Sequence, residues 1–147
     1  MSYEVVTFLS MNGRGAEAID FYVKHLNAKV IFKVTYEDMK KMDPSMVIEG
    51  GKEHWISHSI LEVGVHKIMI AEETMVPKLH YIVGNNFSLC IQSADKQEIE
   101  KIYNSLIQDQ RTEVISPLGK IVFSEAYGIL KDPFGIIIQL NYDKRLA

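Results

Sequence analysis

Two histidines four residues apart are the pattern in this chain that most suggests metal chemistry. On a helix, His54 and His58 would lie one turn apart on one face and could hold a zinc ion. The surrounding HWISHSIL instead alternates like a strand, in which four residues span roughly 13 Å, so one ion cannot bind both. His58 alone stays a candidate, either as a hydrogen-bonding group or general base near neutral pH, or as an ordinary polar residue of a sheet.

Three other side chains could take part in chemistry. Cys90 is the single cysteine, and it would be a nucleophile only as a thiolate of lowered pKa. No Lys, Arg or His adjoins it in FSLCIQS, so we expect a buried, unreactive thiol. Asp132 in DPFG is expected to cap a turn rather than to act as an acid. Glu125 is the carboxylate best placed to bind a cationic group.

The elements that must position these residues occur twice. An apolar stripe with helical spacing recurs 80 positions later, as Ile19, Tyr22, Val23 and Leu26 and then as Ile99, Ile102, Tyr103 and Leu106. An extended run precedes each helix, and a strand-rich stretch with a hairpin follows it. We therefore predict an α+β fold of tandem βαβββ modules that form a curved mixed sheet, with a central cleft and the helices on the outer face.

The boundaries follow from periodicity and turn residues. We predict one domain over residues 1–147, with module one at 1–72, a linker at 73–85 and module two at 86–147. Helices are expected at 16–26 and after Asp95, which stands three residues before Glu98 as in a capping box. The expected strands cover residues 5–11, 29–35, 55–63, 67–72, 87–92, 112–115, 125–131 and 136–141.

Residues 36–53 carry charges, a proline and a Gly-Gly pair, and we interpret them as a mobile loop. A hairpin does not need a connection of this length. We expect the loop either to form a lid over the cleft or to be a surface excursion.

Alternation along each strand assigns side chains to the two faces of the sheet. Leu9, Met11, Ile138 and Leu140 are expected to meet the helices, and the residues between them to face the cleft. The predicted ligand-binding residues on the cleft side are Phe8, His58, Ile70, Ser88, Tyr127 and Gln139.

The internal repeat, the phrase AEAIDFY and the closing YGILKDPFGIIIQL together resemble the vicinal oxygen chelate superfamily. That superfamily holds glyoxalase I, extradiol dioxygenases, and fosfomycin- and bleomycin-resistance proteins. The segments FLSMNGRGAEAIDFY and SHSILEVG look most like its PhnB-like branch. The resemblance covers nearly the whole chain and implies a single glyoxalase-like domain.

The enzymes of that superfamily bind a divalent metal through His, Glu or Gln on the first, fourth, fifth and eighth strands. The matching positions here are Phe8 or Thr7, Ile70 or Met69, Ser88 or Phe87, and Gln139. Only Gln139 could be a ligand, and a neutral amide oxygen is a weak one. A divalent site needs several converging nitrogen or oxygen ligands, so we expect no metal and no other cofactor.

Composition and charge argue against two classes of partner, nucleic acids and membranes. The net charge of −3 and the lack of a Lys/Arg cluster argue against nucleic acid, which requires phosphate neutralisation. No run of 18 apolar residues is present, so we expect no membrane span. The start MSYEVVTF lacks the features of a secretory signal, and we expect a cytoplasmic protein.

These observations predict a metal-free protein that binds an unknown small organic molecule in an apolar cleft, as the resemblance to bleomycin-resistance proteins implies. The alternative is a metal-dependent lyase, isomerase or dioxygenase of the glyoxalase kind. A third reading is a dimeric scaffold without a small ligand. Modules of this family pair, and a repeated sheet leaves open edges, so we expect a homodimer.

Overall fold

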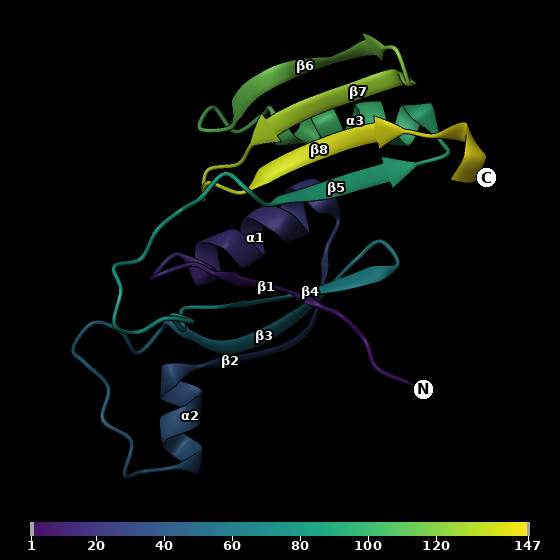
Figure 1. Cartoon of the computed structure of the whole chain (residues 1–147). Coiled ribbons are helices and arrows are strands. Elements are labelled where there is room, and N and C mark those ends of the chain that lie inside the picture. Colours follow the sequence, from purple (N-terminus) through teal and green to yellow (C-terminus); the bar gives the residue numbers. More distant parts are fainter. Residues whose placement is uncertain (1, 147) are drawn as a thin grey trace. The chain divides into compact units, whose positions relative to one another are not determined.

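The order strand–helix–strand–strand–strand occurs twice along the chain, as the repeat predicts (Figure 1). The structure is a computed structural model that describes residues 2–146. It divides into unit 1, which ends at Tyr81, and unit 2, which begins at Ile82. This boundary falls within the linker predicted at 73–85. The α+β class and the tandem βαβββ modules are confirmed, and each module forms a four-stranded sheet of its own.

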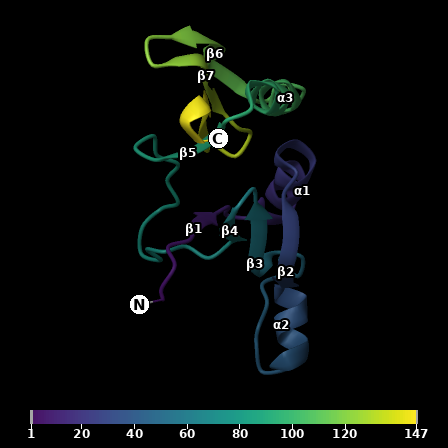
Figure 2. The same cartoon turned by 90° about the vertical axis from the view of Figure 1, so that its right-hand side faces the viewer.

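Unit 1 consists, in chain order, of β1 (Thr7–Ser10), α1 (Gly15–Leu26), β2 (Lys29–Thr35), α2 (Tyr36–Met42), β3 (Ile56–Val63) and β4 (His66–Ala71). Its sheet has the order β1-β4-β3-β2, in which only the β1–β4 pair is parallel. The amphipathic α1 lies along one face and contacts β2, β3 and β4 (Figures 1 and 2). Ile19 and Tyr22 of the predicted stripe are buried there, together with Leu61 of β3.

Unit 2 consists of β5 (Ser88–Ser93), α3 (Lys96–Leu106), β6 (Glu113–Ile121), β7 (Ser124–Lys131), β8 (Ile137–Tyr142) and the short 3-10 helix η1 (Lys144–Leu146). The sheet order β5-β8-β7-β6 repeats that of unit 1, with β5 and β8 parallel. Helix α3 contacts β5, β7 and β8 on one face (Figure 1). Leu130, Ile138 and Leu140 are fully buried, in agreement with the faces predicted for β8. No helix among the described residues is long and apolar enough to span a membrane.

The prediction of a loop throughout residues 36–53 is wrong for its first part. Residues 36–42 form α2, which continues from the end of β2 (Figure 2). Thr35 and Asp38 close a capping box at its start: the Thr35 hydroxyl accepts from the Asp38 N–H, and the Asp38 carboxylate accepts from the Thr35 N–H. These bonds lower the pKa of the Asp38 carboxyl. Whether the segment covers a ligand stays a prediction.

Helix α3 begins with half of the capping box predicted for it. The Asp95 carboxylate accepts from the Gln97 N–H at 2.9 Å. The Asp95 N–H donates to the Ser93 hydroxyl at 3.0 Å, and this is the bond that Glu98 would supply in a complete box.

Strand β6 is longer than predicted. It runs to Ile121, whereas the predicted strand ended at residue 115. Register shifts on β6 accommodate Pro117, because a bulge leaves a residue without a ladder partner.

The prediction that Asp132 caps a turn is confirmed. Its buried carboxylate accepts from the backbone N–H groups of Phe134 and Ile136, both at 2.9 Å. Gly135 has a φ of 88°, a left-handed conformation that favours glycine. Asp132 therefore holds the β7–β8 hairpin.

Candidate functional site

Three of the predicted ligand-binding residues come together in unit 2. Ser88, Gln139 and Tyr127 stand on the neighbouring strands β5, β8 and β7. Gln139 and Tyr127 alternate with buried core residues, and Ser88 pairs with Ile137, two residues before Gln139. They lie on the sheet face opposite α3, here called the open face of unit 2. Each of the three side chains is partly buried, so the open face is partly sheltered from water.

Hydrogen bonds connect these three side chains in one direction, and we call the set the relay. The Tyr127 hydroxyl donates to Gln139 Oε1 at 2.5 Å. Gln139 Nε2 then donates to Ser88 Oγ at 2.8 Å. The relay fixes the orientation of the Gln139 amide, since its oxygen and its nitrogen have different partners.

The strand partners of Gln139, at the centre of the relay, are uncharged. Cys90 is the strand partner of Gln139 on one side, and Ile129 is its partner on the other. The Phe123 ring meets the Tyr127 ring edge to face, with centroids 5.3 Å apart. An apolar ligand body could rest on these groups while its polar atoms meet the relay.

Cys90 is exposed, and the prediction of a buried thiol is wrong. Strand alternation places it on the open face of unit 2, and there α3 cannot cover it. Partial desolvation nevertheless raises the pKa of the thiol. The thiol form therefore dominates at neutral pH, which makes Cys90 a weak nucleophile.

The other predicted site residues lie in unit 1. Phe8 is the strand partner of Met69, and Met69 is the partner of Ile60, so these three share the sheet face opposite α1. His58 lies two residues from Ile60 on the same face, and its ring is 5.8 Å from that of Phe32. The open face of unit 1 is thus apolar and aromatic, with one imidazole.

The assignment of Ile70 to the cleft side is wrong. Ile70 is fully buried and pairs with Leu9, which places it on the face that α1 covers. The β3–β4 hairpin pairs Ile60 with Met69, and a register difference of one residue moves a side chain to the opposite face. Met69 takes the position that was expected for Ile70.

Potential metal ligands are sparse on both open faces. Phe8, Met69 and Ser88 fill three of the four ligand positions named for the superfamily, and Gln139 fills the fourth. The Gln139 oxygen already accepts the Tyr127 hydroxyl. Within residues 2–146, no three His, Cys, Asp or Glu side chains come close enough to hold a metal ion. His54 precedes β3 and is exposed, whereas His58 lies within that strand.

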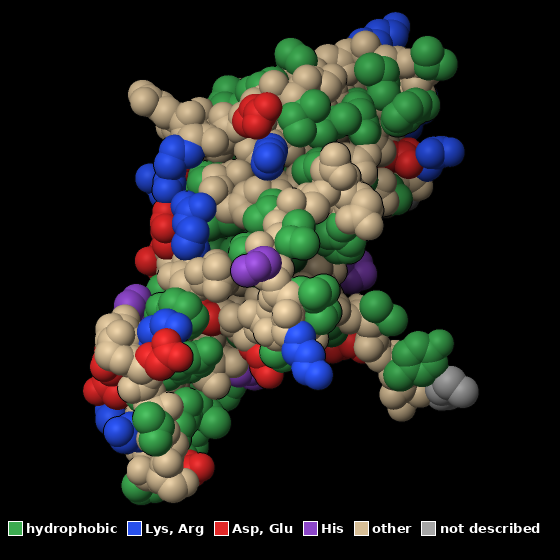
Figure 3. All heavy atoms as spheres, turned by 60° about the vertical axis from the view of Figure 1, so that its left-hand side comes forward, with side chains coloured by type: hydrophobic (Ala, Val, Ile, Leu, Met, Phe, Trp, Pro, Cys, Tyr) green, Lys and Arg blue, Asp and Glu red, His purple; other side chains and the backbone are tan. Residues whose placement is uncertain are grey.

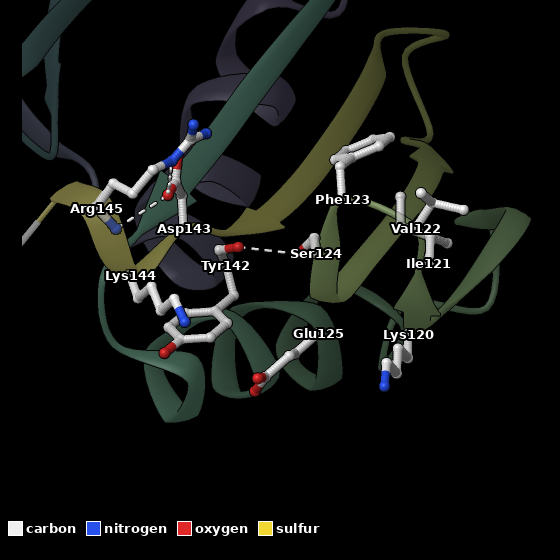
Figure 4. A pocket seen from close by; sticks show the side chains of 10 residues that line it. All are labelled: Lys120, Ile121, Val122, Phe123, Ser124, Glu125, Tyr142, Asp143, Lys144 and Arg145. Carbon is white, nitrogen blue, oxygen red and sulfur yellow. Dashed lines mark hydrogen bonds and ion pairs between the residues drawn. The ribbon is translucent and has the colours of Figure 1, made fainter.

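One cavity of about 360 Å³ lies within unit 2 (Figure 4). Residues of the turn between β6 and β7 and residues 142–145 line it: Lys120, Ile121, Val122, Phe123, Ser124, Glu125, Tyr142, Asp143, Lys144 and Arg145. The Ser124 hydroxyl donates to the Tyr142 carbonyl at 2.8 Å, and this bond joins its two walls. None of the six predicted ligand-binding residues lines this cavity, but Phe123 links it to Tyr127.

Comparison with known families matches residues 3–141 to the family described as 3-demethylubiquinone-9 3-methyltransferase. The chain belongs to this PhnB-like family. The match extends through β1 to β8, and the family is part of the vicinal oxygen chelate superfamily. The resemblance seen in the sequence is thereby confirmed.

Solved structures support the fold of this PhnB-like protein. A protein from Pseudomonas aeruginosa is 23% identical with a TM-score of 0.77, covering 97% of this chain and 98% of the other. A putative 3-demethylubiquinone-9 3-methyltransferase, PhnB protein, from Bacillus cereus is 23% identical with a TM-score of 0.72, covering 96% and 100%. A glyoxalase/bleomycin resistance protein/dioxygenase family enzyme from Burkholderia phytofirmans is 14% identical with a TM-score of 0.61, covering 94% of each chain.

Sequence reasoning missed Glu72 of this PhnB-like chain, a buried carboxylate beside α1. Its oxygens accept from the N–H groups of Gly13 at 2.8 Å, Gly15 at 3.1 Å and Ile56 at 3.2 Å. Arg14 at the N-cap of α1 provides no side-chain cap, so Glu72 satisfies donors at the helix start. No local pattern signals this role, because the partners are up to 59 residues away.

Proposed function

We propose that this PhnB-like protein binds a small organic molecule on the open face of unit 2 and uses no divalent metal. The proposal rests on the relay, because it supplies oriented polar groups on a partly buried surface. Ligand sites combine an apolar lining with a few placed polar groups. Phe123, Ile129 and Cys90 supply the lining in this case.

The open face of unit 1 extends the proposal. His58 stands beside Phe32 with one polar ring among apolar side chains, and Phe8 lies on the same face. We propose Phe8 and His58 as ligand contacts of unit 1 in its own right, with Met69 in the place first given to Ile70. A neutral or protonated imidazole can bond to an oxygen or nitrogen of a ligand.

The alternative is a metal-dependent lyase, isomerase or dioxygenase. Such an enzyme would need Gln139 as a ligand together with several others, and the Gln139 oxygen is engaged by Tyr127. The family description names a methyl transfer, but a shared fold hosts many chemistries and the residues of a site decide among them. The relay offers hydrogen bonds and no strong nucleophile, which favours binding.

A thermal-shift screen of metabolites and antibiotics tests the proposal. A ligand at about 100 times its Kd should stabilise the fold by roughly 2.7 kcal/mol. For a chain of this size that raises Tm by about 5–10 °C. Zinc, nickel, manganese and EDTA should each leave Tm unchanged. Contrary results would be a rise in Tm with one of these metals and elemental analysis showing one metal ion per chain.

We also propose a homodimer. The edge strand β2 exposes three consecutive apolar residues, Val30, Ile31 and Phe32, which are 39%, 48% and 45% exposed. Hydrophobic side chains also gather at the top of Figure 3, where β6 forms an edge of the other sheet. Apolar side chains on an open edge favour association with a second copy.

Light scattering at micromolar concentration should therefore give twice the chain mass of 16.8 kDa. Ile31→Lys should shift the mass towards that of one chain, because it places a charge on the β2 edge. Val65→Lys is the control, since Val65 is 93% exposed in the β3–β4 turn, away from that edge. A single-chain mass for the unmodified protein would refute the dimer.

A further inference from the structure

We infer that the relay selects ligands that carry a hydrogen-bond-accepting oxygen, such as that of a ketone, ester or carboxylate, on an aromatic or aliphatic body, over ligands that only donate hydrogen bonds. This inference rests on the proposed function of the open face of unit 2 and adds the class of ligand.

The direction of the hydrogen bonds determines which donors of the relay are left for a ligand. Tyr127 uses its only hydroxyl hydrogen on Gln139, and Gln139 uses one of its two amide hydrogens on Ser88. The Ser88 hydroxyl hydrogen and the second Gln139 amide hydrogen remain. Within residues 2–146, no acceptor is in place for either. Two donors on adjacent strands therefore await an acceptor from the ligand.

The order of the relay strengthens the donor at its end. Each bond polarises the next along the chain from Tyr127 through Gln139 to Ser88. The Ser88 hydroxyl is the terminal donor of this series, and it is partly shielded from water. An acceptor oxygen placed there gains more than it would against an isolated serine.

The two remaining donors separate ligands that accept hydrogen bonds from ligands that only donate them. Lys131 pairs with Ile137, and Ile137 pairs with Ser88, so a cationic residue stands in the same row of the open face as the terminal donor. A ketone, an ester or a carboxylate can therefore accept from Ser88. The carboxylate of the same strand, Glu125, lies at the opposite end of β7. An ammonium bound at Ser88 would meet donors rather than acceptors and would lose hydration without an acceptor in return.

The lining favours an apolar body behind the acceptor oxygen. Phe123 is 71% exposed, and its ring stands against that of Tyr127. Ile129 and Ile137 are half-buried on the same face. An aromatic ketone matches this lining, with its ring on the apolar side chains of the open face and its oxygen at Ser88.

Three probes that share one ring test the inference: acetophenone, benzoate and benzylamine. Each is titrated at millimolar concentration into the full ¹⁵N-labelled chain, and Kd is measured from NMR shifts of the Ser88 backbone amide and the Gln139 side-chain amide. Acetophenone and benzoate should bind, with benzylamine weaker by about tenfold or more. An affinity for benzylamine equal to that for acetophenone would overturn the inference while leaving the proposed function standing.

Variants locate the selection in the relay. Ser88→Ala should weaken acetophenone by about threefold to tenfold, the value of one hydrogen bond. Tyr127→Phe removes the hydroxyl that donates to the Gln139 oxygen, so this oxygen can accept from a ligand. The difference in affinity between acetophenone and benzylamine should therefore become smaller. Tyr103→Phe on α3 removes a hydroxyl outside the relay and should change neither affinity.

Two other results would count against the inference. An unchanged acetophenone affinity in Ser88→Ala, with a folded spectrum, would overturn the role of the Ser88 donor. A failure of all three probes to shift the relay resonances would overturn the inference as a whole. The thermal-shift screen would then judge the proposed function separately, because it does not depend on these probes.

Discussion

Replacing Glu72 with alanine is expected to lower the free energy of unfolding by about 3 kcal/mol or more. The substitution leaves the backbone N–H groups of Gly13, Gly15 and Ile56 without their acceptor. Each buried donor that loses its partner costs roughly 1–3 kcal/mol. Glu72 is only 3% exposed, so water cannot readily replace the carboxylate.

Urea denaturation followed by the fluorescence of Trp55 measures this loss, because Trp55 is the only tryptophan and packs on Gly13 beside Glu72. Glu72→Gln should cost less than Glu72→Ala, since the amide keeps one acceptor oxygen. Glu73→Ala is the matched control, because Glu73 is the next residue and its carboxylate is exposed. Its removal should lower the free energy of unfolding by under about 0.5 kcal/mol. Equal losses for Glu72→Ala and Glu73→Ala would show that Glu72 does not support the start of α1.

Replacing Asp132 with alanine is expected to destabilise unit 2 by about 2–3 kcal/mol. The substitution leaves two backbone N–H groups, those of Phe134 and Ile136, without an acceptor. Both belong to the β7–β8 hairpin, which carries Tyr127 and Gln139. Asp132→Asn should restore part of the stability, because its amide oxygen can still accept.

Thermal unfolding followed by circular dichroism tests this prediction. Asp43→Ala is the control, because the Asp43 carboxylate caps an exposed turn by accepting from Ser45. It should cost less than about 1 kcal/mol. A Tm for Asp132→Ala equal to that of the unmodified chain would contradict the account of the hairpin.

Strand periodicity was enough to place the relay residues on the face away from the helix. Side chains alternate with a period of two, so the expectation that Ile138 and Leu140 meet the helix placed Gln139 on the other face. Three of the six predicted residues then met in one hydrogen-bonded set. The direction of their bonds could not be predicted, because it depends on side-chain orientation.

Ile70 was misplaced because an apolar run such as KIMIA does not reveal its own register. Met69 and Ile70 are both apolar, and only the pairing with β3 and β1 decides which of them is buried. Cys90 was expected to be buried for a related reason. A free cysteine is usually buried, but the open face of unit 2 has no helix above it.

Helix α2 and Glu72 illustrate two further limits. The spacing Thr35-x-x-Asp38 is a capping signal, and it could have revealed α2 inside the segment taken for a loop. Glu72 had no such signal, since its donors come from the β1–α1 turn and from the start of β3. Long-range polar contacts of this kind emerge only from the folded chain.

The side-chain amide resonances of Gln139 give the most direct test of the central claim, that this position serves an organic ligand and not a metal. The account predicts that a ligand from the screen shifts these resonances, whereas paramagnetic Mn²⁺ leaves their linewidths unchanged. Selective broadening of the Gln139 amide by Mn²⁺, without a shift from any organic ligand, would contradict the account and favour a metal-dependent enzyme.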